Sequence, residues 1–251
     1  MTDDSGDFGD FGDSLTIVSL LPRLLDTNGD AANARVLAQR ARWSGLAARV
    51  VPVHDLADVP DTVDLVSIGS GTDADALATR DALLPLAGAL RSWLAGGVPI
   101  LAVGTGWELL SDGLDLSGGT RVDGLALVAG RAHALPARAT DDIVVATDDA
   151  RLIGFENHAR GFTGAQRPLG RVQSGTGNGD GHEGVIVGSF IGTHLHGPVL
   201  ARNPHLADLM LGAACTTRGL PSPVSTQAAA VDGIAKAARN QVAVRLGLSS
   251  D

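Results

Sequence analysis

Short apolar runs alternate with amphipathic stretches along the first hundred residues of the chain. Runs at 15–21, 48–53, 64–68 and 99–103 have the length and apolar content of buried strands. Between them lie stretches with apolar residues at helical spacing, including an alanine- and leucine-rich one that reaches about residue 95. Because strands that alternate with helices form parallel sheets, we expect an α/β fold with a mostly parallel sheet covered by helices.

The second half of the chain is richer in strand-like runs. These runs are short, apolar or alternating, and they lie at 125–128, 143–146, 152–155, 170–173 and 184–194. The glycine-rich stretch 174–181 is followed by neither Lys-Ser/Thr nor a helix, which favours a flexible hairpin connection over a phosphate-binding loop. We therefore expect additional β structure in this half, followed by a helix at 203–214.

The chain divides into three parts. Residues 1–13 are rich in Asp and Gly and have no apolar period, which predicts a disordered acidic tail. Residues 14–216 hold the elements of one domain, and 217–251 form a proline-containing linker and a C-terminal helix. That helix would dock on the domain or on a partner through an apolar stripe formed by Val231, Ile234, Ala238, Val242 and Leu246.

Composition narrows the functional classes. The net charge is −9 and Lys236 is the only lysine, which argues against nucleic acid or an anionic membrane surface as a direct partner. The single cysteine, Cys215, excludes an internal disulfide, and residues 1–4 lack the basic start of a signal peptide. No uncharged apolar run reaches membrane-spanning length. We expect a cytoplasmic protein without a transmembrane segment.

The last of the first-half strands runs directly into Gly104-Thr105-Gly106, after which a helical pattern resumes. This is the arrangement of a nucleophile elbow, in which a strained turn lifts a Ser or Cys above the sheet and the next backbone N–H helps to bind an oxyanion. The lifted position here is Gly104, which has no side chain. Ligands gather at the carboxyl ends of parallel strands, so Gly69, Gly71 and Thr105 are candidate substrate-binding residues.

Three further motifs, together with the elbow, resemble those of a known family. Asn28-Gly29-Asp30-Ala31-Ala32-Asn33 resembles that family's Tyr-Gly-Asp-x-x-Asn, with Asn28 at the usual tyrosine. Gly154-Phe155-Glu156-Asn157-His158 matches its Gly-Phe-Glu-Asn-His in full, and His196-Gly197-Pro198 resembles the segment with the catalytic histidine, His194 replacing a tyrosine. Over roughly 15–211, the chain resembles class I glutamine amidotransferases of the cobyric-acid-synthase-like branch, specifically the GatD family, the glutaminase subunit of lipid II isoglutaminyl synthase.

The resemblance implies the flavodoxin-like fold of class I amidotransferases and a cysteine thiolate that attacks glutamine while a histidine carries the proton. The family's cysteine corresponds to Gly104, a vacant nucleophile position, and its histidine to His196. Cys215 is a poor substitute because it lies in a late helix, and Thr105 has no evident adjacent base. We therefore expect that the chain's own glutaminase activity is lost. The other hypothesis is that Gly104 is a substitution in a natively cysteine-containing enzyme.

Several other residues enter through the resemblance. Arg138 lies near the expected glutamine-binding arginine, which would hold the α-carboxylate, with Arg131 as the alternative. Asp30, Asn33 and Asn157 are supporting candidates, although Asp30 is as well placed to cap a helix.

The same two interpretations apply to Asp73, which follows a predicted strand and precedes a helix. His158 is interpreted as a structural member of its loop. No metal site is expected at His194 and His196, which lie two residues apart on a predicted strand.

The resemblance also implies partners. A Mur-ligase-like synthetase would use ATP and Mg²⁺ to amidate D-glutamate in lipid II, and this chain would supply or gate ammonia from glutamine without a cofactor of its own. The synthetase would also bring the chain to the inner face of the membrane. The alternative is a pseudo-amidotransferase that acts only as a structural or regulatory partner of the synthetase.

Overall fold

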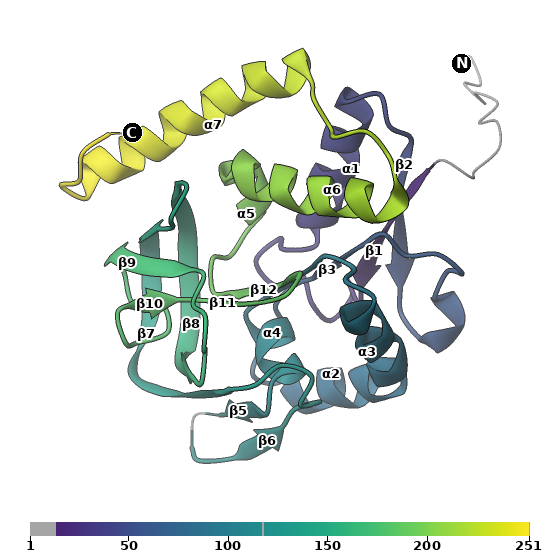
Figure 1. Cartoon of the computed structure of the whole chain (residues 1–251). Helices are drawn as coiled ribbons and strands as arrows, with labels where there is room; N and C mark the ends of the chain where they lie inside the picture. Colours follow the sequence, from purple (N-terminus) through teal and green to yellow (C-terminus); the bar gives the residue numbers. More distant parts are fainter. Residues whose placement is uncertain (1–13, 117, 251) are drawn as a thin grey trace, which may run out of the picture.

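The computed structural model describes residues 14–116 and 118–250, so the tail expected at 1–13 lies outside the described residues. The first of its two sheets has the strand order β11-β12-β4-β3-β1-β2 (Figure 1). Its strands are β1 (Leu15–Leu20), β2 (Ala48–Val53), β3 (Leu65–Ile68), β4 (Ile100–Val103), β11 (Val185–Val187) and β12 (Phe190–Thr193). Every pairing in this sheet is parallel except that of β11 with β12. The mostly parallel sheet is confirmed, and its first four strands match the predicted runs to within one residue.

The predicted run at 184–194 is the hairpin of β11 and β12, and it joins the parallel sheet. β12 lies parallel to β4, with Thr193 paired with Val103. Because the two strands end at the same edge of the sheet, the residues that follow them meet there. This pairing brings the His196 segment to the elbow.

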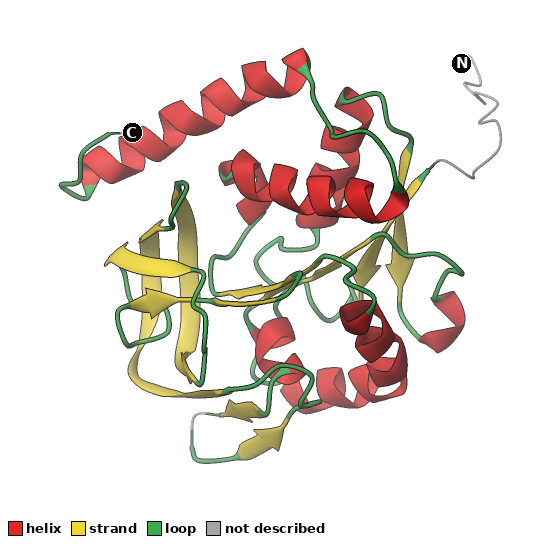
Figure 2. Ribbon diagram, in the orientation of Figure 1, coloured by secondary structure: helices red, strands yellow, loops and turns green. Residues whose placement is uncertain are grey.

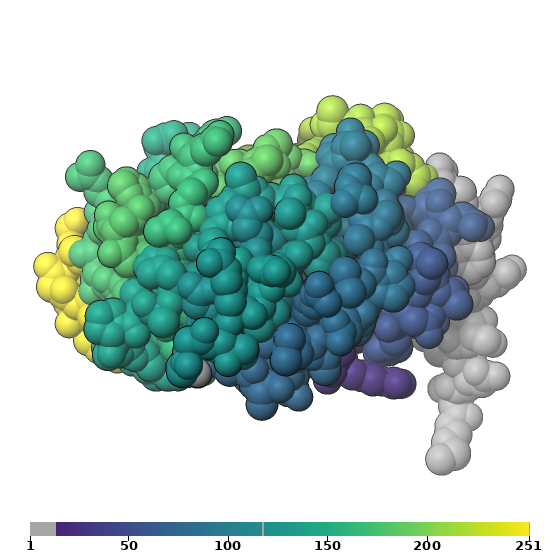
Figure 3. Space-filling model, turned by 90° about the horizontal axis from the view of Figure 1, so that it is seen from below, coloured from purple at the N-terminus to yellow at the C-terminus, as the bar shows by residue number. Residues whose placement is uncertain are grey.

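Helices cover both faces of the first sheet (Figure 2). One face is covered by α1 (Ala32–Trp43), α5 (Val199–Arg202) and α6 (Pro204–Arg218), the helix predicted at 203–214. The other face is covered by α2 (Ala76–Leu83), the 3₁₀ turn η3 (Leu84–Leu86), α3 (Ala87–Ala95) and α4 (Thr105–Leu110), which contribute to the face seen in Figure 3. A further 3₁₀ turn, η2 (Leu56–Asp58), follows β2.

The helix predicted to reach residue 95 is interrupted. It consists of α2, η3 and α3, and the interruption contains Pro85. Proline has no N–H to donate and its ring crowds the preceding turn, so the backbone does not continue as a single α-helix.

Strand β1 shows how the core is divided. Leu15 and Ile17 pack with α1 and α6 on one face, while Val18 and Leu20 pack with the helices of the opposite face. All four side chains are at most 1% exposed. The uninterrupted apolar run therefore reflects a strand buried on both faces.

The second sheet has the order β10-β9-β7-β5-β6, with β8 paired to β7. Its strands are β5 (Gly113–Asp115), β6 (Arg121–Asp123), β7 (Arg131–Ala146), β8 (Arg151–Thr163), β9 (Gly170–Ser174) and β10 (His182–Glu183). The runs predicted at 143–146 and 152–155 are the adjoining ends of the long strands β7 and β8. The prediction of extra β structure is thus confirmed, although the sequence indicated only part of these two strands.

The strand predicted at 125–128 is wrong. The backbone N–H groups of Leu125 and Leu127 donate to the carbonyls of Leu109 and Leu110, at the end of α4. Leu125 and Val128 are buried, which accounts for the apolar pattern. This backbone satisfies the last carbonyls of a helix and does not pair with a strand.

The C-terminal helix α7 (Thr226–Arg245) docks on the domain. The buried Arg40 of α1 lies 2.7 Å from both Asp208 of α6 and Asp232 of α7. The face that is buried consists of Ala228, Ala235 and Ala243, whereas Ile234 of the predicted stripe is 72% exposed. The predicted stripe is therefore buried only in part: Val242 and Leu246 are half-buried, whereas Val231, Ile234 and Ala238 are exposed.

Candidate functional site

The elbow is the sharpest turn of the site. Gly104, between β4 and α4, has φ 50° and ψ −123°, a conformation that L side chains rarely adopt. Its N–H donates to the carbonyl of Thr193 at 2.8 Å, and its carbonyl accepts from the N–H of Glu108 at 2.9 Å. The turn is thus held by β12 on one side and by the first turn of α4 on the other.

Two side chains face the empty position at Gly104. A Cβ atom built there would lie 2.6 Å from His196 Cε1 and 2.6 Å from Ser70 Oγ. The structure therefore brings His196 to Gly104, the predicted nucleophile position, and adds Ser70, which sequence reasoning missed.

His196 is buried and held from one side. Its Nδ1 lies 3.0 Å from Nδ2 of Asn28 and 3.3 Å from Oδ2 of Asp30. Its Nε2 is buried without a hydrogen-bond partner among the described residues. Nδ1 either accepts from Asn28 Nδ2 or donates to Asp30 Oδ2, and in the tautomer that donates to Asp30 the lone pair of Nε2 is free to accept a proton in the site.

Asp30 joins three loops at this point. Its Oδ1 accepts from the N–H of Gly197 at 2.7 Å, and its Oδ2 accepts from the N–H of Ser70 at 3.1 Å. Asp30 is fully buried and does not cap α1, whose N-cap is Ala31. The sequence left open whether Asp30 caps a helix or belongs to the site. In the structure Asp30 contacts His196 and therefore belongs to the site.

Asn33 supports the same loop without facing the cavity. Its Nδ2 donates to the carbonyl of Asp30 at 2.9 Å, and its Oδ1 accepts from the N–H of Leu200 at 3.0 Å. The Asn28–Asn33 motif therefore acts as a clamp that fixes the histidine segment beside the elbow.

The cavity in front of the elbow has a volume of about 130 Å³. Among the predicted substrate-binding residues, Gly71, Thr105 and Arg138 line it. Gly69 does not line it: a Cβ there would lie 2.0 Å from the carbonyl oxygen of Leu25, so glycine is required for close backbone packing.

Arg138 and Asn157 lie together at the exposed rim. Arg138 Nη1 is 3.4 Å from the Oδ1 and from the carbonyl oxygen of Asn157, and Asn157 Nδ2 donates to Asn28 Oδ1 at 3.0 Å. The alternative, Arg131, instead pairs with Asp115 at the β5–β7 junction. A guanidinium at the Arg138 position is suited to hold a carboxylate at the mouth of the cavity.

A buried ionic cluster forms the floor of the cavity. Arg160 lies 2.8 Å from Glu108 and 2.6 Å from Asp73, which also lines the cavity. Burial alone would raise the pKa of Glu108, but the charge of Arg160 and the contact with His194 outweigh it and lower that pKa to about 2. The sequence did not indicate this cluster, because Glu108 and Arg160 are 52 residues apart.

His194 lies deeper, between two carboxylates. Its Nε2 is 3.6 Å from Glu108 and its Nδ1 is 3.5 Å from Glu183, and all three side chains are buried. Burial favours the neutral imidazole, but the two carboxylates outweigh it and raise the pKa of His194 to about 9. His194 is therefore a buried imidazolium that contacts Glu108 in the lining of the cavity.

His158 stacks on the His194 ring with the centroids 4.3 Å apart. Burial, followed by the charge of His194, lowers the pKa of His158 and keeps it neutral. Its Nδ1 contacts the carbonyl of Arg160 and its Nε2 lies 3.4 Å from Glu156. His158 lies on β8 rather than in a loop and also lines the cavity, so its purely structural role stays a prediction. His194 and His196 lie beyond the end of β12 and have different surroundings: His194 lies against the Trp107 ring and His196 against Asp30.

Cys215 lies away from this cavity. It is 1% exposed on α6 and packs in the apolar core between that helix and the first sheet. Burial raises the pKa of its thiol. The structure thus gives no route by which this cysteine takes over the elbow position.

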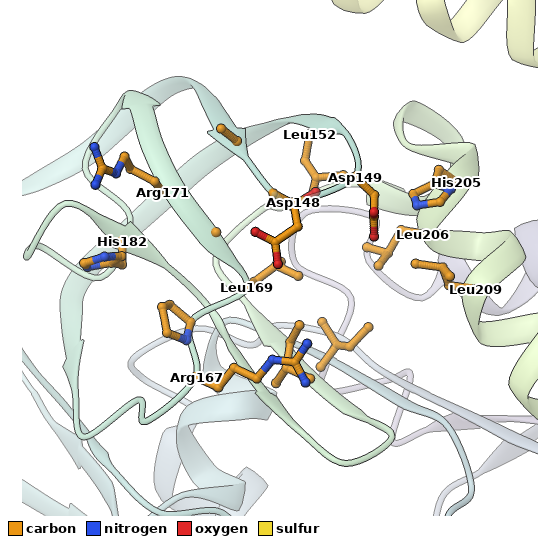
Figure 4. A pocket seen from close by; sticks show the side chains of 16 residues that line it. Asp148, Asp149, Leu152, Arg167, Leu169, Arg171, His182, His205, Leu206 and Leu209 are labelled. Carbon is orange, nitrogen blue, oxygen red and sulfur yellow. The ribbon is translucent and has the colours of Figure 1, made fainter.

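A larger hollow of about 510 Å³ lies elsewhere, between the β7–β8 turn, the β9 region and α6 (Figure 4). Asp148, Asp149, Arg167 and His205 stand around an apolar base that includes Leu206. None of the predicted site residues lines it.

Within the described ranges, no helix is long and apolar enough to cross a bilayer.

Comparisons with known proteins find relatives over most of the chain. The model of the CobB/CobQ-like glutamine amidotransferase domain matches residues 17–204. The lipid II isoglutaminyl synthase (glutamine-hydrolyzing) subunit GatD of Staphylococcus aureus strain N315 is 32% identical over 212 residues, covering 82% of this chain and 87% of that protein. The subunit of the same name from Streptococcus pneumoniae is 30% identical over 202 residues, 77% of each chain.

Among solved structures, a crystal structure of a glutamine amidotransferase superposes with a TM-score of 0.55 at 15% identity. It covers 78% of this chain and 98% of the other, and it supports the fold. The family model spans the whole elbow and histidine region, and two relatives are at least 30% identical over most of the chain. The chain therefore belongs to the CobB/CobQ-like glutamine amidotransferase family.

Proposed function

We propose that this chain is the amidotransferase-like subunit of a complex of the lipid II isoglutaminyl synthase type, and that it has lost cysteine-dependent glutamine hydrolysis. The proposal rests on one observation. The elbow at Gly104 has φ 50° and ψ −123° and faces Cε1 of His196, whose Nε2 has no hydrogen-bond partner among the described residues, yet it has no side chain that attacks a carboxamide.

The rest of the site supports a role in handling glutamine or ammonia. Arg138 stands at the mouth of the cavity, and His196 is held by Asn28 and Asp30. In this proposal the partner is a Mur-ligase-like synthetase that holds ATP and Mg²⁺ and amidates D-glutamate of lipid II. The complex works on the cytoplasmic side, and the synthetase brings it to the inner face of the membrane.

The vacant elbow also favours a second function, in which the chain is only a structural or regulatory partner of the synthetase. These two functions differ in whether the chain changes the synthetase's use of ammonia. A subunit that gates ammonia changes the ammonium concentration at which the synthetase reaches half its maximal rate. A structural partner raises the yield or melting temperature of the synthetase and leaves that concentration unchanged.

The decisive experiment measures ammonia release from glutamine by the purified chain, alone and with the synthetase, ATP and Mg²⁺. We expect no release above the buffer background, and amidation of lipid II with ammonium chloride but not with glutamine. Ammonia release well above background would refute the loss of hydrolysis. A parallel titration of ammonium, with and without the chain, separates gating from a structural role.

A further inference from the structure

Ser70 lines the cavity, and the proposed function gives it no role. It follows β3, lies between two glycines and is 4% exposed. Its Oγ is 2.6 Å, and its Cβ 3.0 Å, from the position that a Cβ of residue 104 would take. Non-bonded heavy atoms prefer separations of about 3.5–4.0 Å, so the Ser70 side chain stands in the space of a side chain on the elbow.

The backbone of Ser70 is held in place. Its N–H donates to Asp30 Oδ2 at 3.1 Å, and its carbonyl accepts from the N–H of Thr27 at 2.9 Å. Asp30 is in turn tied to the His196 segment through the N–H of Gly197. The loop therefore does not move away from the elbow without breaking contacts that also position the histidine.

The Ser70 hydroxyl also meets the backbone donor of the elbow. The N–H of Thr105 points to Ser70 Oγ at 3.4 Å, a long hydrogen bond. At a nucleophile elbow, the N–H after the nucleophile is one of the groups that stabilise the oxyanion. Ser70 thus takes up both the space of the missing side chain and a donor that the reaction requires.

We propose that Ser70, together with Gly104, closes this site to hydrolysis, so that activity returns only when both positions are changed. In the single variant G104C, the cysteine Cβ would lie 2.6 Å from both Ser70 Oγ and His196 Cε1, which is too close for non-bonded atoms. His196 is anchored by Asn28 and Asp30, whereas removal of the Ser70 side chain leaves space into which residue 104 can shift away from His196. This inference rests on the proposed function, since it takes the cavity to be an amidotransferase site.

Ser70 is not placed as a replacement nucleophile. The N–H that would stabilise the oxyanion already points at Ser70 Oγ, and His196 Nε2 has no hydrogen bond to this hydroxyl. A nucleophile requires its base within hydrogen-bond reach and its oxyanion donor free.

The test compares four variants of the full chain: G104C, G104C/S70G, G104C/S70A and the control G104C/S67G. Ser67 is buried on β3 and does not line the cavity, so S67G repeats the chemical change at a site away from the elbow. Circular dichroism establishes that each variant is folded, and S70A replaces S70G if the glycine prevents folding. Iodoacetamide labelling of the thiol introduced by G104C is followed by mass spectrometry, with the buried Cys215 as an internal reference.

We expect the introduced thiol to be labelled roughly tenfold faster or more in G104C/S70G than in G104C, with a parallel gain in ammonia release from glutamine. The S67G control should match G104C. Equal labelling and equal ammonia release in G104C and G104C/S70G would overturn the proposal. A fifth variant, S70A alone, tests the remaining alternative: ammonia release by the unsubstituted chain that S70A abolishes would also overturn the proposal, because Ser70 would then be the nucleophile. Faster labelling without glutaminase activity would support the closure by Ser70 and place the failure in the proposed function.

Discussion

The buried imidazolium of His194 predicts that the protein loses stability in mildly alkaline solution. The pKa of His194 is raised from 6.5 to about 9 in the folded chain, because Glu108 and Glu183 outweigh the effect of burial. A group with a raised folded-state pKa stabilises the fold fully below its unfolded pKa, and this contribution disappears as the pH rises through the folded value. The contribution is therefore complete below pH 6.5 and is lost by about pH 9.

The magnitude follows from the two pKa values. At about 1.4 kcal/mol per pKa unit, the rise from 6.5 to about 9 corresponds to roughly 3 kcal/mol of the free energy of unfolding. No allowance for solvent screening is needed, since the His194 side chain is 0% exposed. Against a typical domain stability of about 5–15 kcal/mol, a loss of this size is readily measured.

The assay is urea unfolding followed by circular dichroism at several pH values between about 6 and 9, the range that spans the two pKa values. His194→Gln removes the titrating ring, and His205→Gln is the matched control, because His205 is exposed on α6. We expect H194Q to be less stable than the unsubstituted chain at pH 6, and this difference to shrink by roughly 3 kcal/mol by pH 9. The H205Q variant should follow the unsubstituted chain throughout. A difference between H194Q and the unsubstituted chain that is the same at pH 6 and pH 9 would refute the reasoning.

Two further predictions concern the other ionic contacts. Arg160→Met removes the cation that compensates buried Glu108, so it should lower the free energy of unfolding by roughly 3–5 kcal/mol, measured in urea at pH 7. Arg80→Met serves as the control, because Arg80 is only partly buried and pairs with the exposed Asp81; an equally small effect in both variants would contradict this prediction. Asp232→Asn removes one of the two carboxylates on Arg40, so the amides of α7 should exchange hydrogen faster while the rest of the chain is unchanged. Unaltered exchange in α7 would show that this pair does not hold the helix.

The local pattern of apolar residues and glycines was sufficient to predict the parallel sheet and the sharp turn at Gly104. The continuous apolar run of β1 and the glycines after β4 require a strand buried on both faces and a sharp turn at its end, whatever the rest of the chain does. The motif around His196 indicated a histidine for the site, and the pairing of β12 with β4 is what carries it there. The same local reasoning failed at 125–128, where a buried loop has the apolar pattern of a strand.

What the tertiary structure decided is which distant polar groups meet. Ser70 is an ordinary loop serine in the sequence, and it becomes an obstacle only because β3 and β4 are neighbours in the sheet. Glu108, Arg160 and His194 have no shared period or motif, yet they share one buried site. Apolar periodicity is a property of one segment, so the sequence determines it. Charge compensation and steric fit depend on pairs of atoms from different segments, so only the folded chain determines them.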